Sequence, residues 1–206
     1  MRTDTVSSFL GQLAARVPAP GGGATAGLHA AQAAALVAMV ARYSDAPRFA
    51  EHAATITAVT ATADDLRAQA LGLAEEDAAV FGEVAQAYAL PKATEEEAAA
   101  RSAAIATALV AAARVPAEVV QVADRTLGLA EQLLPIGNRN VISDVAAAAE
   151  AARAAATTAR VNVEINLAGI RSADVRAELA AAIAAVDDVV ARAEQVTAAV
   201  RAELAR

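Results

Sequence analysis

The chain has 206 residues, of which 57% are hydrophobic and only 2% aromatic, and its formal net charge is −7. This length suits one domain with its own core, and an acidic chain without a basic stripe argues against a nucleic-acid partner. No cysteine is present, which excludes disulfides and thiolate metal sites and favours a cytoplasmic location.

Alanine supplies much of the hydrophobic content, and it is the best helix former and a poor strand former. Prolines and glycines cluster between long runs of Ala, Glu, Arg and Leu. The sequence therefore predicts an all-α, single-domain bundle of six or seven helices over residues 1–206, including long antiparallel ones. Residues 17–41 carry no formal charge, but prolines and glycines fill the first half of this stretch, so no membrane span is expected.

Apolar residues at helical spacing predict the first elements in chain order. We expect a short helix over residues 5–17, a second over 23–43 after "PAPGGG", and a long proline-free one over 48–88. The long helix has two apolar heptad series, which predict that one side packs against neighbouring helices.

Capping residues and prolines mark the later helices. Thr94 and Glu97 form a capping box, so a helix begins near residue 95. Pro116 suits the first turn of another helix that ends near residue 134. Ser143 is expected to cap a helix over 144–167, and Ser172 a last one over 173–205.

One carboxylate interrupts the apolar side of the long helix. Asp77 falls in a heptad series otherwise made of hydrocarbon, and Phe81 and Tyr88 share its stripe. Such a carboxylate is costly unless it is paired, hydrogen-bonded or protonated. Asp77 is therefore either half of an ion pair with an arginine of a neighbouring helix, or a group whose pKa is raised by burial and which serves proton transfer or binds a cationic ligand edge.

Lys92 is the only lysine, beside sixteen arginines. An ammonium group loses its proton more readily when desolvated, whereas a guanidinium stays charged, so Lys92 suits acid–base chemistry near neutral pH. The alternative is a solvated turn residue without a function.

Two further segments carry polar groups at helix starts. Asp144 lies in a first helical turn, and Asn162 and Asn166 project to the same side of that helix, although Asp144 and Asn162 are about 27 Å apart along it. The free amides after "PGGGAT" at residues 20–25 could hold a carboxylate or phosphate, but close helix packing explains the glycines as well. The two histidines lack metal-ligand spacing, so no metal is expected.

Five segments in order resemble one known family: "FLGQLAARVPAPGGGATAGLHAAQAAALVAMVAR", "EEDAAVFGEVAQAYALPKATEEEAAARSAAI", "VPAEVV", "GNRNVISD" and "ARVNVEINL". Over roughly residues 5–170 the chain resembles the formiminotransferase-cyclodeaminase C-terminal family, which includes stand-alone bacterial methenyltetrahydrofolate cyclohydrolases. The resemblance implies an all-helical homodimer with long helices at its interface, and one-carbon chemistry on a tetrahydrofolate derivative as substrate.

The resemblance also implies roles. Lys92 would be the proton shuttle, Asp77 the carboxylate that tunes it and stabilises positive charge, and Asp144 either the group that binds the pterin's donor edge or the base. The amides of the glycine loop would hold the substrate's glutamate carboxylate. The implied substrate-binding residues are Pro20, Gly21, Gly22, Gly23, Thr25, Asn138, Asn140, Ser143, Asn162 and Asn166.

The expected activity is hydrolysis of 5,10-methenyltetrahydrofolate to 10-formyltetrahydrofolate, because the chain lacks a transferase domain that would deliver a formimino group. Formiminotetrahydrofolate cyclodeamination, or a helical dimer that binds folate without turnover, are the alternatives. The chain departs from the family at Ala24, where serine is usual, and at "RYSDAPRF", where many relatives are lysine-rich. Any anchor for a polyglutamate tail in that stretch is reduced to Arg42 and Arg48.

Overall fold

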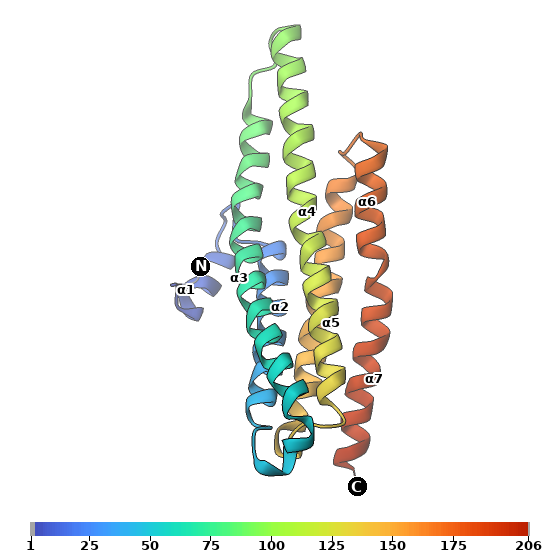
Figure 1. The fold of residues 1–206 in the computed structure, drawn as a ribbon. Coiled ribbons are helices and arrows are strands. Elements are labelled where there is room, and N and C mark those ends of the chain that lie inside the picture. The colour runs from blue at the N-terminus through green and yellow to red at the C-terminus, as the bar shows by residue number, and fades with distance from the viewer. Residues whose placement is uncertain (1–2, 206) are drawn as a thin grey trace.

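The computed structural model describes residues 3–205 and is entirely helical over them (Figure 1). α6 and α7 follow one another almost in line, so the seven helices of the described residues pack as six helical segments. This arrangement confirms the predicted all-α bundle. The elements are α1 Val6–Leu13, α2 Gly22–Arg42, the 3-10 turn η1 Pro47–His52, α3 Ala53–Ala89, α4 Glu95–Leu133, the 3-10 turn η2 Arg139–Val141, α5 Ile142–Leu167, α6 Ala173–Ala184 and α7 Val186–Leu204.

Small residues let the helices approach closely at the centre of the bundle. α2 packs against both α3 and α5, and its inward positions Ala26, Ala30 and Ala34 are fully buried. A Cβ on Gly27 would lie 2.8 Å from the Cβ of Ala74 in α3, so the glycine is needed for this contact. Alanine thus fills the core by shortening the distance between helices rather than by adding side-chain volume.

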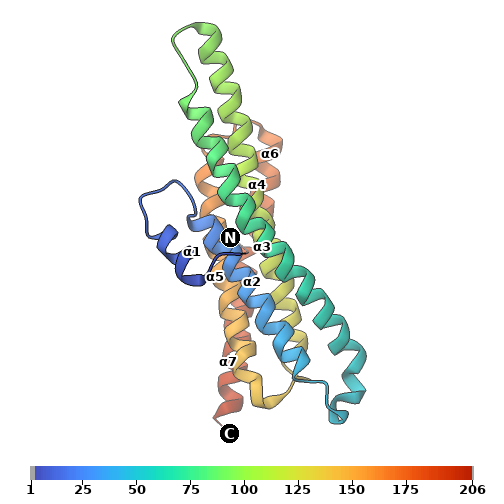
Figure 2. The same ribbon diagram turned by 90° about the vertical axis from the view of Figure 1, so that its left-hand side faces the viewer.

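α3 and α4 form an antiparallel hairpin that projects beyond the other helices (Figures 1 and 2). They have 37 and 39 residues, whereas α2 has 21 and α5 has 26. The capping box at the start of α4 is confirmed, because the Glu97 N–H donates to Thr94 Oγ1 and the Thr94 N–H donates to the Glu97 carboxylate. The hairpin tip between α3 and α4 therefore has a defined end.

The predicted break at Pro116 is wrong, because α4 runs through it. A proline inside a helix leaves the carbonyl four residues earlier without its usual donor, here Ala112 O. Asn166 of α5 donates from its Nδ2 to that oxygen over 3.5 Å. The burial of Pro116 and this hydrogen bond from another helix together compensate for the lost backbone bond.

Three other expected boundaries differ from the structure. α1 ends at Leu13 rather than near residue 17, and Ser143 lies inside the first turn of α5, whose cap position is Val141. Ser172 does cap a helix, accepting from the Val175 N–H, but the helix stops before Ala185 and α7 follows.

Two helices, α2 and α4, are long and apolar enough to cross a membrane by length and composition alone. In the structure 61% and 50% of their most apolar windows are buried inside the bundle. Packing of the bundle core accounts for these apolar stretches.

Candidate functional site

A cavity of about 440 Å³ opens where the start of α2, the end of α5 and the α3–α4 hairpin meet. We call it the Asp77 cavity. It is lined by the glycine loop from Gly21 to Gly23, by Asp77 and two aromatic side chains of α3, and by Asn162 and Asn166 of α5. Pro20 lies within the same loop, between two residues that line the cavity. The structure therefore brings together three of the segments that the sequence singled out.

The Asp77 carboxylate is seated against the N-terminus of α2. Burial raises the pKa of Asp77, and a hydrogen bond from the Ala24 backbone N–H opposes that rise. A Cβ on Gly23 would collide with the carboxyl atoms of Asp77, so only glycine leaves room for the seat. The positive end of the α2 dipole favours the ionised form, while the loss of water favours the neutral one.

This seat bears on the expected role of the glycine loop as a site for the substrate's carboxylate. The N-terminus of α2 already holds a carboxylate that belongs to the protein, and a second carboxylate beside it would be repelled. Of the three glycines, Gly23 is needed for the close contact with Asp77, whereas a Cβ on Gly22 would lie at an ordinary contact distance of 3.4 Å from the Asn162 Nδ2. The glutamate of a folate therefore needs another cation.

Asn162 and Asn166 donate from their amide nitrogens to backbone carbonyls, and their side-chain oxygens are free among the described residues. Asn162 Nδ2 donates to Thr158 O over 2.8 Å, and Asn166 Nδ2 donates to Asn162 O over 2.7 Å. Within residues 3–205 no donor contacts either side-chain oxygen. Both side chains line the Asp77 cavity, which thus has two fixed acceptors for N–H donors of a ligand.

Lys92 is not part of this cavity. It is exposed at the tip of the α3–α4 hairpin, fifteen residues after Asp77, which corresponds to roughly 20 Å along the helix. The expected pairing of Asp77 and Lys92 is therefore not formed within one chain.

Asn138 lies at the opposite end of the bundle, and both polar atoms of its side chain have partners within the chain. Its Nδ2 donates to Tyr43 O over 2.8 Å, and its Oδ1 accepts from Arg48 and from the Asn140 N–H. Its backbone N–H donates to the buried Ser44 Oγ over 2.9 Å. We call this set the Asn138 clasp; it joins the end of α2 to the loop before α5.

The expected substrate-binding role does not fit this end of the molecule within one chain. Each polar atom of the Asn138 side chain already has a partner, and Asn140, Ser143 and Asp144 line none of the five best-formed cavities in residues 3–205. Asp144 is also about 27 Å along α5 from Asn162.

Three more expectations concern residues near α2. The Thr25 hydroxyl donates to Gly21 O over 2.9 Å, and its side chain lines a separate cavity beneath α1. Arg42 forms an ion pair with Asp64, and Arg48 donates to the Asn138 clasp. Both arginines lie at the far end of α2, on the order of 28 Å from the glycine loop. They are badly placed to anchor a tail that leaves the Asp77 cavity.

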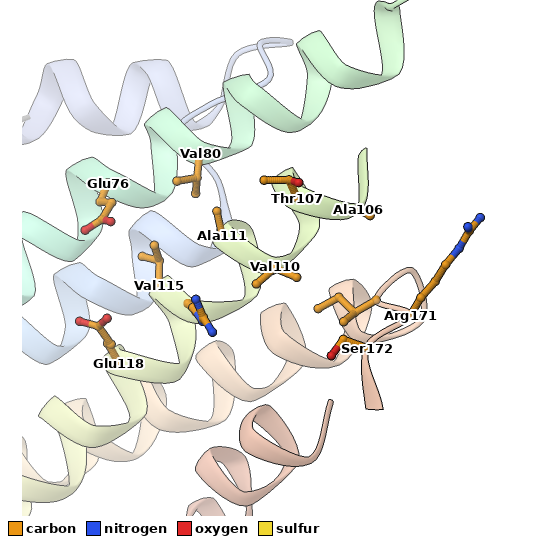
Figure 3. Close-up of a pocket in the computed structure, with 12 residues that line it drawn as sticks. Glu76, Val80, Ala106, Thr107, Val110, Ala111, Val115, Glu118, Arg171 and Ser172 are labelled. Carbon is orange, nitrogen blue, oxygen red and sulfur yellow. The ribbon is translucent and has the colours of Figure 1, made fainter. Parts of the chain in front are cut away.

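A larger groove of about 580 Å³ lies nearby, and Val80 lines both it and the Asp77 cavity (Figure 3). Glu76 and Glu118 point into one end of it, and Ser172 lies toward the other. Both glutamates are exposed, so water solvates them, and the groove contains none of the predicted site residues. The smaller cavity is the better candidate because it holds a carboxylate partly out of water. Among residues 3–205 no group of three His, Cys, Asp or Glu side chains could hold a metal.

Comparison with known proteins bears on what the Asp77 cavity does. The formiminotransferase-cyclodeaminase family matches residues 5–185 of the chain. The chain belongs to this family. The family consists of folate one-carbon enzymes of the cyclohydrolase and cyclodeaminase type, and a folate derivative is the substrate that this membership implies.

The relatives include both activities. A methenyltetrahydrofolate cyclohydrolase of Methylorubrum extorquens is 38% identical over 81% of this chain and 81% of its own length. A mouse formimidoyltransferase-cyclodeaminase is 32% identical over 79% of this chain, which corresponds to 30% of that protein. The crystal structure of a formiminotetrahydrofolate cyclodeaminase from Thermotoga maritima superposes with a TM-score of 0.87 at 26% identity and covers 98% of each chain.

The sequence places Asp77, Phe81 and Tyr88 on one stripe but indicates no role for the two aromatic residues. Both line the Asp77 cavity. The signal was their spacing from Asp77, four and eleven residues, which places all three on one face of α3. The seat of Asp77 on Ala24 could not be found in this way, because it depends on contact between two helices.

Proposed function

We propose that the chain hydrolyses 5,10-methenyltetrahydrofolate to 10-formyltetrahydrofolate in the Asp77 cavity, in the cytoplasm. The observation that carries this proposal is the Asp77 carboxylate, partly removed from water and open to a cavity with two amide acceptors. The similarity to a methenyltetrahydrofolate cyclohydrolase over four fifths of both chains supports the choice of reaction.

The reaction needs a negative group near a cation. The carbon that bridges N5 and N10 of the substrate carries positive charge, which a carboxylate of low solvent exposure stabilises more strongly than water does. Water adds to this carbon and loses a proton, for which Asp77 is the acceptor in the cavity. The C–N5 bond then breaks, N5 takes a proton, and the formyl group remains on N10. Asn162 and Asn166 accept hydrogen bonds from the N–H groups of the pterin and hold it in place.

Lys92 can take part only from a second copy of the chain. The projecting hairpin exposes Leu90 near its tip, which is 42% exposed, and two such hairpins packed antiparallel would form a four-helix bundle. The tip of one copy would then approach the Asp77 cavity of the other. In this homodimer Lys92 of the partner subunit is the proton shuttle.

Cyclodeamination is the second candidate, because the solved cyclodeaminase superposes over nearly the whole length of both chains. There N10 attacks a formimino carbon on N5, and ammonia leaves from the tetrahedral carbon. The same carboxylate and acceptors serve this reaction.

Loss of methenyltetrahydrofolate absorbance with purified protein tests the main proposal, and ammonia release from formiminotetrahydrofolate tests the second. Acceleration of the first reaction over buffer supports the cyclohydrolase, and acceleration of only the second replaces it by the cyclodeaminase. If neither reaction is accelerated while folate binds, the chain is a binding protein and the proposal is wrong.

Complementation tests the shared site. Asp77→Asn and Lys92→Met proteins are each expected to be inactive as pure dimers. Each mixed dimer has one site with both intact residues, so re-equilibrated equimolar mixtures should recover roughly a quarter of wild-type activity. No recovery in a mixture shown to contain mixed dimers, or full activity of Lys92→Arg alone, would dismiss Lys92 as the shuttle.

A further inference from the structure

Two of the five aromatic residues in the chain lie on the wall of the Asp77 cavity. Phe81 and Tyr88 are about half exposed, at 48% and 51%, and no other aromatic side chain lines this cavity. Both follow Asp77 on the same face of α3, about 6 Å and 16 Å further along the helix. A chain that builds its core from alanine therefore places two flat apolar surfaces beside its candidate site.

A cation lies at the outer end of this series. Arg101 of α4 donates from Nε and from one terminal nitrogen to Tyr88 O, over 3.2 and 3.0 Å, and its guanidinium carbon is 5.6 Å from the centre of the Tyr88 ring. These contacts fix the position of Arg101 but leave several of its five N–H groups free. Within residues 3–205 it forms no ion pair, so its charge remains available to an anion.

We call Phe81, Tyr88 and Arg101 the aromatic track. Asp77 and the two amide oxygens lie at the inner end of this track, the two aromatic rings follow along α3, and the guanidinium lies beside the outer ring. A folate has the complementary order, with N–H donors on the pterin, a cationic carbon, a benzoyl ring and a glutamate. With the pterin and the cationic carbon at the inner end, the benzoyl ring meets the aromatic rings and the glutamate meets the guanidinium.

We infer that the benzoyl ring of the substrate lies on Phe81 and Tyr88 and that its glutamate binds Arg101. This inference rests on the proposed function, since it names the subsites for the same substrate. Aromatic stacking tolerates a flat ring without hydrogen bonds, and a guanidinium binds a carboxylate through paired N–H donors.

The other cations and amides near the cavity do not serve the glutamate. The N-terminus of α2 holds the Asp77 carboxylate, and Arg42 is paired with Asp64 at the far end of the bundle. Arg101 is the cation whose contacts connect it directly to a residue of the cavity wall.

Binding of substrate fragments tests the track without reference to turnover. The probes are a tetrahydropterin, p-aminobenzoylglutamate and p-aminobenzoate, titrated by calorimetry into the full-length protein. We expect Tyr88→Leu and Phe81→Leu each to weaken p-aminobenzoylglutamate about tenfold and to leave the tetrahydropterin unaffected. Tyr88→Phe, which keeps the ring, should restore most of what Tyr88→Leu loses.

Arg101→Gln should weaken p-aminobenzoylglutamate about tenfold and leave p-aminobenzoate unchanged, because the latter has no glutamate. In an active enzyme the losses should fall mainly on KM. Val161→Ala is the matched control, since Val161 is 60% exposed on α5 and does not line the cavity; it should change none of these affinities.

Three results would overturn the inference. The first is unchanged p-aminobenzoylglutamate binding in Tyr88→Leu, and the second is equal weakening of the pterin and benzoyl fragments, which indicates a general distortion of the cavity. The third is dissociation of a dimer by Phe81→Leu or Tyr88→Leu in sedimentation, because the rings would then face a second copy. The proposed function fails separately, when the wild-type protein accelerates neither folate reaction.

Discussion

The two ends of the bundle use the same kind of residue in opposite ways. At the Asn138 clasp the side-chain nitrogen and oxygen of Asn138 both form hydrogen bonds within the chain. At the Asp77 cavity Asn162 and Asn166 donate to backbone carbonyls, while their oxygens have no donor within residues 3–205. Polar motifs that look alike in sequence are thus divided by the fold into one that joins segments and one that is left for a ligand.

The largest expected effect is the loss of turnover when Asp77, at the cavity end of the bundle, is replaced. Asp77→Asn keeps the shape and can still accept from the Ala24 N–H, but it removes the charge and the proton acceptor. We expect turnover to fall by about 10²–10⁴-fold without loss of thermal stability at pH 7, since burial disfavours the ionised form in the fold. Enzyme assay and calorimetry measure both quantities. A much lower melting temperature with turnover retained would make Asp77 a structural cap of α2.

Substitutions of Gly23 and Gly21 test whether the close contact with Asp77 stabilises the cavity end. Gly23→Ala places a methyl group against the Asp77 carboxyl atoms, so we expect a loss of about 1–3 kcal/mol in unfolding free energy together with reduced turnover. Gly21→Ala is the control, because its Cβ would meet no atom within 4 Å, and its stability should change by less than about 0.5 kcal/mol. Urea denaturation compares the two; equal effects would show that the contact with Asp77 does not matter.

At the opposite end, Asn138→Ala should lower stability and leave catalysis intact. The change removes the acceptor for Arg48 and the donor to Tyr43 O, and we expect a cost of about 1–2 kcal/mol. Asn140→Ala removes an exposed side chain and should have little effect on stability. Turnover of the folded Asn138→Ala protein, measured below its melting temperature, should match wild type. A loss of kcat without a loss of folding would show that Asn138 belongs to the catalytic site.

The smallest effect is a dependence on pH. Because the pKa of Asp77 is raised in the fold above its ordinary value of 3.8, the folded state holds this proton more tightly than the unfolded chain. The contribution of Asp77 to stability therefore falls as pH rises from about that value through the raised pKa. The melting temperature of Asp77→Asn relative to wild type should rise over this window and then level off. A constant difference across acidic pH would contradict the raised pKa.

Most of the fold followed from local features of the sequence. Alanine content, the capping box at Thr94 and the cap at Ser172 each act within one or two turns, and the structure confirms them. The break predicted at Pro116 was wrong because Asn166 of another helix compensates for the missing hydrogen bond. A contact between helices cannot be read from the local sequence. The interruption at Ala185 has no sequence signal that we can identify.

The site was predicted in part, for a related reason. Asp77, the glycine loop, Asn162 and Asn166 meet as expected, since each is placed by its position along a helix. Lys92 and Asp144 were grouped with them by motif, although the rise per residue already places both far from the cavity within one chain. The seat of Asp77 on α2 depends on how closely two helices approach, and only the structure shows this.

The solitary ammonium side chain at the hairpin tip also has a practical consequence. A reagent that acylates amines at alkaline pH finds one lysine side chain in this chain, on an exposed turn, besides the α-amino group. A dye or cross-linker can therefore be attached at position 92 without engineering a cysteine. Energy transfer from that dye would then report how closely the tips of two molecules approach in solution.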